Sequence, residues 1–234
     1  MIHDDVDFRL EGYKAASKNT EESFFNSFVC GEFTTLAECH TEDGRRSYYV
    51  LHDSTEAFGI PGEPEIVALH IQRDAENQVY RFQHTTVPLP AMAQSWLIAR
   101  GCPKEGIRLP PSASTDDSTR VLEERIMGDG DHFALIGNYT DHGPCTFMTL
   151  VLLRALDEQE PTPFRVLLER VDTRTWTRTL REGGFRTYQE AATWWKANWS
   201  RKAPELPALS AGPSSLREPS AVPAPAAPPT GPAR

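Results

Sequence analysis

The stretch TLAECHTEDGRRSYYVL, at residues 35–51, is followed 99 positions later by a similar stretch, ALIGNYTDHGPCTFMTL, at residues 134–150. In each stretch two runs of β-forming residues flank a short polar turn, which predicts a β-hairpin. Chance gives about one identity in a window of this length. Four pairs are identical, namely Leu36 and Leu135, Thr41 and Thr140, Gly44 and Gly143, and Leu51 and Leu150. The similarity predicts that the chain contains one structural unit twice.

A second similarity, at an offset of 98, extends the pattern to the next hairpin and to the helix after it. The matching pairs are Leu69 and Leu167, Asp74 and Asp172, Ala93 and Ala191, Trp96 and Trp194, and Ala99 and Ala197. The tryptophan pair is the most informative because tryptophan is rare, and the change of offset by one residue falls in a loop, where insertions are tolerated. The alternative interpretation is that two ordinary α+β layouts resemble each other by convergence.

Each unit is predicted to consist of a helix, four antiparallel strands and a second helix. In the first unit the apolar stripe Phe24, Phe25, Phe28 and Val29 predicts the opening helix, with Asn19 as its N-cap. The expected strands of this unit are 34–39, 47–51, 66–72 and 79–84, and the second unit repeats the order with hairpins at 132–152 and 164–181 and a last helix from 187.

The predicted fold class is α+β, a tandem pseudo-repeat with a disordered Pro/Ala-rich C-terminal tail. We expect the helices of each unit to cover one face of its sheet, and the two units to pack as a pseudo-dimer with a cleft at a pseudo-twofold axis. Residues 203–234 hold nine prolines in 32 residues and no aromatic residue, so they cannot bury enough surface to offset the entropy lost on ordering. The expected organisation is a poorly ordered acidic lead-in (1–18), a first unit (19–101), a linker (102–113), a second unit (114–200) and a disordered Pro-rich tail (201–234).

Charge is distributed unevenly along the chain, whose formal net charge is −9. Residues 1–101 carry 8 Lys/Arg against 16 Asp/Glu, whereas residues 163–202 carry nine basic groups against four acidic ones. This pattern predicts an acidic first unit and a basic C-terminal edge. No apolar run approaches the roughly 20 residues needed to cross a bilayer, so we expect a cytoplasmic protein without membrane contact. The four cysteines are irregularly spaced, and we expect them to be reduced thiols.

The usual signatures of catalysis and of cofactor binding are absent from the sequence. It has no G-x-S-x-G elbow, no P-loop and no Gly-rich dinucleotide turn, so we expect no cofactor and favour a non-catalytic protein over an enzyme. Asp129 and Asp131 beside His132 resemble part of a metal loop, but an apolar run cuts the loop short, which favours a solvated turn. His40 lies beside Cys39, yet neighbours on a strand point to opposite faces, which disfavours a thiol with an adjacent base.

The basic edge is the main candidate for a binding surface, because arginine forks beside aromatic rings suit the recognition of anionic partners. The candidate residues are Arg165, Arg170, Arg174, Trp176, Arg178 and Arg181. We therefore predict a non-catalytic protein-interaction or regulatory module whose partner is an acidic protein or the acidic unit of a second copy. Glutamate at positions 170, 174 and 178 is expected to abolish partner capture and to leave the thermal midpoint nearly unchanged.

Two alternatives remain open. A hydrolase would use acidic residues in the cleft between the two units, and it requires a concave pocket there with at least two acids of raised pKa. A nucleic-acid-binding protein would use the same Arg/Trp edge, and it would bind oligonucleotides with a steep dependence on salt.

Overall fold

The computed structural model describes residues 6–29, 31–54, 64–110, 113–129, 132–199 and 204–209. Within these ranges the chain forms two five-stranded sheets and four α-helices, which confirms the α+β class. The expected disorder of the tail beyond residue 209 and the placement of Asp131 lie outside the described residues.

The two sheets have the same strand order. The N-terminal sheet consists of β1 (Lys14–Ala15), β2 (Phe33–His40), β3 (Arg46–Asp53), β4 (Ile66–Asp74) and β5 (Val79–Val87), and the C-terminal sheet of β6 (Ser114–Thr115), β7 (Phe133–His142), β8 (Thr146–Ala155), β9 (Phe164–Asp172) and β10 (Thr177–Phe185). Their orders are β1-β5-β4-β3-β2 and β6-β10-β9-β8-β7. Four strands of each sheet are antiparallel, as predicted, and a two-residue strand pairs in parallel with the last of them. The prediction missed these short strands because two residues show no periodicity.

Helices cover both faces of each sheet, so the expectation that they cover one face was wrong. The helices are α1 (Lys18–Phe24), which continues as the π-helical turn η1 (Phe25–Val29), α2 (Pro90–Ile98), the 3-10 turn η3 (Lys104–Ile107), α3 (Asp117–Gly128) and α4 (Tyr188–Trp199). In β3, Tyr49 and Leu51 pack beneath α1, whereas Tyr48 and Val50 pack beneath α2. All four side chains are fully buried, which explains why this strand reads as a continuous apolar run rather than an alternating one.

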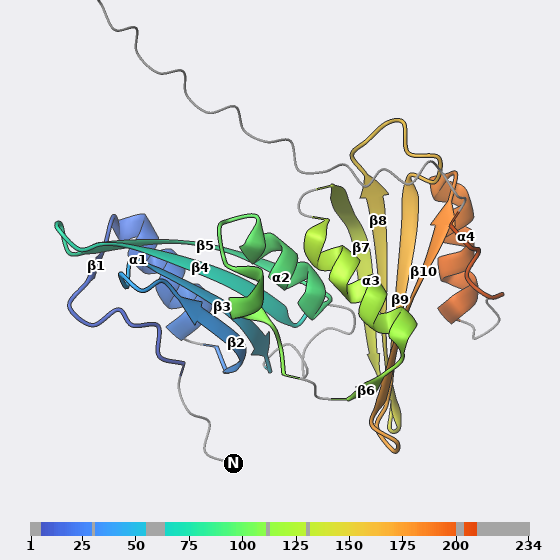
Figure 1. The fold of residues 1–234 in the computed structure, drawn as a ribbon, viewed down its shortest axis with the longest axis horizontal. Helices are drawn as coiled ribbons and strands as arrows, with labels where there is room; N and C mark the ends of the chain where they lie inside the picture. Colours follow the sequence, from blue (N-terminus) through green and yellow to red (C-terminus); the bar gives the residue numbers. More distant parts are fainter. Residues whose placement is uncertain are drawn as a thin grey trace, which may run out of the picture.

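The two units stack in the same direction along the chain. We call β1 to η3 the N-terminal unit and β6 to α4 the C-terminal unit. Helices α2 and α3 lie between the two sheets, and α1 and α4 lie on the outer sides (Figure 1). Leu89 and Ala91 at the start of α2 share one core cluster with Ile126 of α3 and Val151 of β8. A twofold axis would bring like faces together, but here the α2 face of one unit meets the α3 face of the next, so the predicted pseudo-twofold is corrected to a head-to-tail stack.

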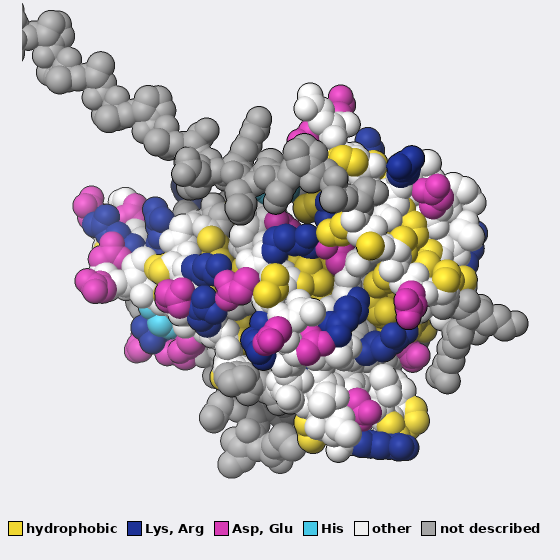
Figure 2. Space-filling view, turned by 45° about the vertical axis from the view of Figure 1, so that its right-hand side comes forward, with side chains coloured by type: hydrophobic (Ala, Val, Ile, Leu, Met, Phe, Trp, Pro, Cys, Tyr) yellow, Lys and Arg dark blue, Asp and Glu magenta, His cyan; other side chains and the backbone are white. Residues whose placement is uncertain are grey.

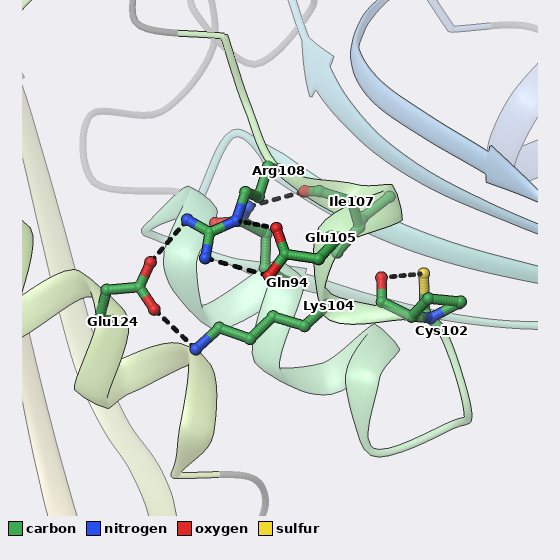
Figure 3. A network of polar contacts seen from close by, with 8 residues as sticks. Gln94, Cys102, Lys104, Glu105, Ile107, Arg108 and Glu124 are labelled. Atoms are coloured by element: carbon green, nitrogen blue, oxygen red, sulfur yellow. Dashed lines mark hydrogen bonds and ion pairs between the residues drawn. The ribbon is translucent and has the colours of Figure 1, made fainter.

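A polar clamp reinforces this junction (Figure 3). The carboxylate of Glu124 on α3 binds Lys104 Nζ at 2.6 Å and Arg108 Nη1 at 2.7 Å, and Arg108 also binds Glu105. Gln94 of α2 donates to the carbonyl of Ile107 at 2.7 Å. Together with the apolar cluster, these contacts fill the space between α2 and α3.

Strand registers show which residues of the two units correspond. Tyr48 pairs with His70, and Leu150 pairs with Leu168. Asp74 pairs with Val79, and Asp172 pairs with Thr177, so β4 and β5 correspond to β9 and β10 at an offset of 98, as proposed from the sequence. The first hairpins do not correspond at 99, because their strands match at offsets of 100 and 102. The strands of the second unit's hairpin are longer, with 10 residues each against 8 in the first unit. The four identities at an offset of 99 are therefore not equivalent positions.

The same type of turn connects β4 to β5 and β9 to β10. Asp74 Oδ1 accepts the backbone N–H groups two and three residues later, and Asp172 Oδ1 does the same. Gln78 and Trp176, which are equivalent at the offset of 98, both have positive φ, at 51° and 50°. The shared geometry supports the correspondence more strongly than residue identity does, because an aspartate-anchored turn with a left-handed residue is a specific backbone shape.

The described parts of the predicted poorly ordered lead-in (1–18) and of the predicted disordered tail (201–234) contact the sheets. At the N-terminal end, Phe8 packs against the core beneath α1, and the buried Arg73 donates to the carbonyls of Phe8 and Arg9 at 2.7 and 2.8 Å. At the other end, residues 204–209 lie along β10, where Gly184 N donates to the carbonyl of Pro207 at 3.2 Å. A Cβ at Gly183 would lie 2.7 Å from Leu206, so a larger residue at position 183 would have to displace the Leu206 side chain.

Candidate functional site

A groove of about 560 Å³ opens on the outer face of the C-terminal unit, beside the end of α4. It is lined by Tyr139, Asp141, Gly143, Pro144, Cys145, Thr146, Met148, Arg170, Arg174 and Asn198. Arg170 and Arg174 belong to the surface predicted from the sequence. The remaining lining residues come from the β7–β8 hairpin and from α4, and no pattern in the sequence groups them.

The floor of the groove is formed by strands that extend past α4. Asp141 pairs with Met148 across β7 and β8, and Met148 pairs with Arg170 across β8 and β9. Residues directly opposite each other in neighbouring strands point to the same face, so the three side chains form a row. Tyr139 and Met148 also pack against the core beneath α4. Asn198 Nδ2 lies 3.4 Å from Met148 Sδ and closes one wall.

Electrostatically the groove offers two guanidinium groups and one carboxylate. Among the described residues, neither Arg170 nor Arg174 takes part in an ion pair, and both are exposed. The carboxylate of Asp172 lies next to Arg174 but is engaged by the turn, since the backbone N–H groups of Arg174 and Thr175 lower its pKa. Two cationic groups are thus available to an incoming anion, beside a partly apolar floor.

Three other arginines of the predicted surface are neutralised by ion pairs. Arg165 binds Glu160 at 2.6 Å and Glu182 at 2.9 Å. Arg178 binds Glu169 at 2.9 Å and also Glu123, and Arg181 binds Asp116, the residue that caps α3. On the face shown in Figure 2, basic and acidic side chains lie interspersed with hydrophobic ones. Of the arginines of the predicted basic edge, Arg170 and Arg174, near the end of the β9–β10 hairpin, are the two outside the ion pairs of the described residues.

Trp176 is the remaining member of the predicted surface, and it lies at the tip of that hairpin. Its side chain is 62% exposed and does not line the groove. Its left-handed backbone is unusual for an aromatic residue, but Gln78 adopts the same conformation in the equivalent turn. The backbone strain therefore belongs to the turn and is not evidence for a function of Trp176.

A serine, a histidine and a carboxylate meet at the β2–β3 hairpin, in a way that superficially suggests nucleophilic catalysis. His40 Nδ1 lies 2.8 Å from Ser47 Oγ, and His40 Nε2 lies 3.6 Å from Glu38 Oε1. Ser47 is fully buried, and Arg73 Nη1 donates to its Oγ at 2.9 Å. A nucleophile must reach its substrate and gains nothing from a cation that binds its lone pairs, so this cluster supports the fold.

A second cluster joins the two units at one carboxylate. Glu65 accepts from His52 Nε2 at 3.3 Å and from His142 Nε2 at 2.9 Å. Two imidazoles and a carboxylate are common metal ligands, but each nitrogen here points at a separate oxygen of the same carboxylate. In the part of the chain that the structure describes, no group of three or more His, Cys, Asp or Glu side chains is placed to hold a metal ion.

Comparisons with known proteins give no further guide to this site. No family model, curated protein or solved structure matches the chain. The function must therefore be argued from the groove and its surroundings. Among the described helices, none is long and apolar enough to span a bilayer.

Acidic residues with raised pKa lie away from the groove. Burial raises the pKa of Glu169, although Arg178 opposes the shift, and burial also raises the pKa of Asp129. Neither residue lines the groove, and both have arginines beside them. The junction between the units, where a hydrolase would place its carboxylates, is packed by the cluster that includes Leu89 and Met127. These acids give no support to a catalytic pair at that place.

Proposed function

We propose that the protein is a non-catalytic interaction module and that the groove of its C-terminal unit binds an acidic segment of a partner protein. The observation that carries this proposal is the pair of exposed guanidinium groups of Arg170 and Arg174 on a groove whose floor includes Tyr139 and Met148. An anionic side chain can take two hydrogen bonds from each arginine fork, while apolar atoms beside it are removed from water.

Several features favour binding of a peptide segment over binding of a nucleic acid. Nucleic-acid binding depends on many phosphate contacts made by unpaired cations, whereas Arg165, Arg178 and Arg181 are held in ion pairs. Asp141 within the groove can accept hydrogen bonds from the backbone N–H groups of a peptide, which a sugar–phosphate backbone lacks. The partner's specificity would then come from a few anchoring side chains.

The proposal can be tested by selecting ligands from a random peptide library displayed on phage. The wild-type chain is expected to enrich peptides with an excess of Asp and Glu, and the double variant R170E/R174E is expected to lose this enrichment. The matched control is R186E, which reverses an exposed charge that does not line the groove. Affinities of the enriched peptides should fall at least about tenfold in the double variant, or about 1.4 kcal/mol, and stay within about twofold in the control.

Two outcomes would contradict the proposal. One is equal enrichment by the wild type and the double variant, and the other is enrichment of neutral or basic sequences. Thermal unfolding of both variants must accompany the selection, since a loss of binding in an unfolded variant would be uninformative. We expect both midpoints to stay close to that of the wild type, because the side chains of Arg170 and Arg186 are exposed.

A further inference from the structure

The N-terminal unit contains a counterpart of the groove, which shows how this part of the fold can be occupied. By register, Cys39, Arg46 and Tyr48 are equivalent to Tyr139, Met148 and Leu150. The corresponding surface is therefore the same row of positions on the α2 face of the N-terminal sheet, next to the C-terminal end of α2.

In the N-terminal unit this surface is covered by the chain itself, through the segment that follows α2. Tyr48 Oη donates to the carbonyl of Arg100 at 3.3 Å. A Cβ at Gly101 would lie 3.4 Å from Arg46 Nη1, and a Cβ at Gly106 would lie 2.5 Å from Cys39 Sγ. Gly101 has a φ of +92°, which turns the chain down onto the sheet.

The covering segment also buries an aliphatic side chain. Ile107, at the end of η3, is fully buried among the residues beneath α2. Its carbonyl accepts from Gln94, and the charged side chains of Lys104 and Arg108 point away toward Glu124 (Figure 3). The segment is thus a short turn with glycines against the sheet and one apolar anchor.

The chain takes another course in the C-terminal unit. Asn198, the counterpart of Arg100, is a wall of the groove. Further on, Trp194 Nε1 donates to the carbonyl of Pro204 at 2.9 Å, and Leu206 packs beside Gly183 of β10. Residues 204–209 therefore lie at the β10 side of α4, whereas the groove lies over β7, β8 and β9.

We propose that a partner segment binds the groove in the place that residues 101–107 occupy on the N-terminal unit. This inference rests on the proposed function and specifies its ligand: a short glycine-containing turn with an aliphatic anchor and acidic side chains directed at Arg170 and Arg174. The floor favours such a ligand, because Met148 stands where the N-terminal unit has Arg46. An arginine side chain at this position favours contact with polar groups, whereas a methionine side chain favours contact with an apolar group of the ligand.

The chain's own C-terminal residues are a poorer match to this groove. Residues 210–234 contain one acid, Glu218, against the two basic residues Arg217 and Arg234. Two guanidinium groups favour a ligand with an excess of negative charge. We therefore assign the groove to a segment of a partner protein, and binding of the tail becomes one outcome of the test.

The test uses a probe derived from the covering segment itself. Residues 101–107 read GCPKEGI, and the fluorescently labelled probe GSPEEGI replaces the cysteine with serine and the lysine with glutamate. Its affinity for the full-length chain, measured by fluorescence anisotropy, is expected to exceed that of a scrambled peptide of the same composition and that of GSPKKGI by at least about tenfold. The variant R170E/R174E should lose binding of GSPEEGI, and R186E should retain it.

The outcomes separate this inference from the proposed function. Equal binding of GSPEEGI and its scrambled form, with both lost in R170E/R174E, would overturn the specific turn and leave the acidic interaction intact. Absence of GSPEEGI binding would also contradict the proposed glycine-containing turn as the ligand. The library selection would still decide whether the groove binds acidic segments. Binding that is insensitive to the double variant would contradict both. An affinity that rises at least about tenfold when the chain is ended at residue 209 would identify the tail as the occupant and overturn the partner assignment.

Discussion

Arg178 provides the sharpest test of the charge arrangement in this fold. Its guanidinium joins three elements, because it lies on β10 and binds Glu169 of β9 and Glu123 of α3. The side chains of Arg178, Glu169 and Glu123 are only 22%, 13% and 20% exposed. Burial by itself lowers the pKa of Arg178, but the two carboxylates outweigh this effect and the net shift is upward. One cation therefore forms ion pairs with two largely buried carboxylates.

Replacing Arg178 with alanine leaves these two carboxylates facing each other without a cation. Removing one partner of a fully buried ion pair costs about 3–5 kcal/mol, and the residual exposure of this site reduces the expected loss to about 2–3 kcal/mol. For a chain of this length, 1 kcal/mol shifts the unfolding midpoint by about 2–4 °C. We therefore expect the midpoint of R178A to fall by about 5–10 °C.

The assay is thermal unfolding followed by circular dichroism at neutral pH, with R170A as the matched control on the neighbouring strand. R170A removes an exposed arginine and should change the free energy of unfolding by less than about 0.5 kcal/mol. The triple variant R178M/E169Q/E123Q removes all three charges and should recover most of the loss. Equal midpoints for R178A and R170A would refute the reasoning. The same argument corrects our expectation that glutamate at position 178 leaves stability unchanged.

Three further predictions address other contacts. Burial, helped by the charges of Arg46 and Arg100, lowers the pKa of His70 from 6.5 to about 4, so the unfolded chain takes up the proton first and stability is lost as pH falls from about 6.5 toward 4. H70L, which copies the leucine at the equivalent position 168, should reduce this loss in urea titrations at pH 7 and pH 5, and an unchanged slope would contradict the assignment. A chain ending at residue 203 should unfold at lower temperature than one ending at 209, because it lacks the packing of Leu206; equal midpoints would show that this segment is unimportant. S17A should lose about 1 kcal/mol of unfolding free energy in chemical denaturation, because Ser17 caps α1, whereas N19A, at the cap expected from the sequence, should lose less; the reverse order would refute the cap.

Local patterns in the sequence predicted the order of the elements well. The apolar stripes of the helices and the polar turns between strands depend on neighbours in the chain, and those signals are present in any single sequence. The offset of 98 held because the Asp74 and Asp172 turns fix the length of their hairpins. The offset of 99 failed because the β7–β8 hairpin is longer, a difference that scattered identities could not reveal.

Long-range partners explain what could not be predicted. Arg178 and Arg181 looked like free cations because their partners on and before α3, Glu123 and Asp116, lie more than 50 residues earlier in the sequence. Coverage of both sheet faces was missed for a different reason. Residues 47–51 were expected to form a strand of a sheet with helices on one face, although five consecutive buried residues require cover on both sides. The groove itself depends on where α4 ends relative to the strands, which no local pattern encodes.

The head-to-tail stack explains why this surface is covered in the N-terminal unit and open in the C-terminal unit. Met92 and Ile98 of α2 contact the core between the two units, and their counterparts in α4 are Glu190 and Lys196. Glu190 instead caps its own helix, by accepting from the backbone N–H groups of Arg186 and Thr187. The outer side of α4 is therefore more polar than the side of α2 that contacts the neighbouring unit. The N-terminal unit must use the chain after α2 to reach its neighbour, and that chain covers its sheet on the way. Residues 204–209, the described part of the chain after α4, instead follow β10, so they leave the equivalent surface of the C-terminal unit uncovered.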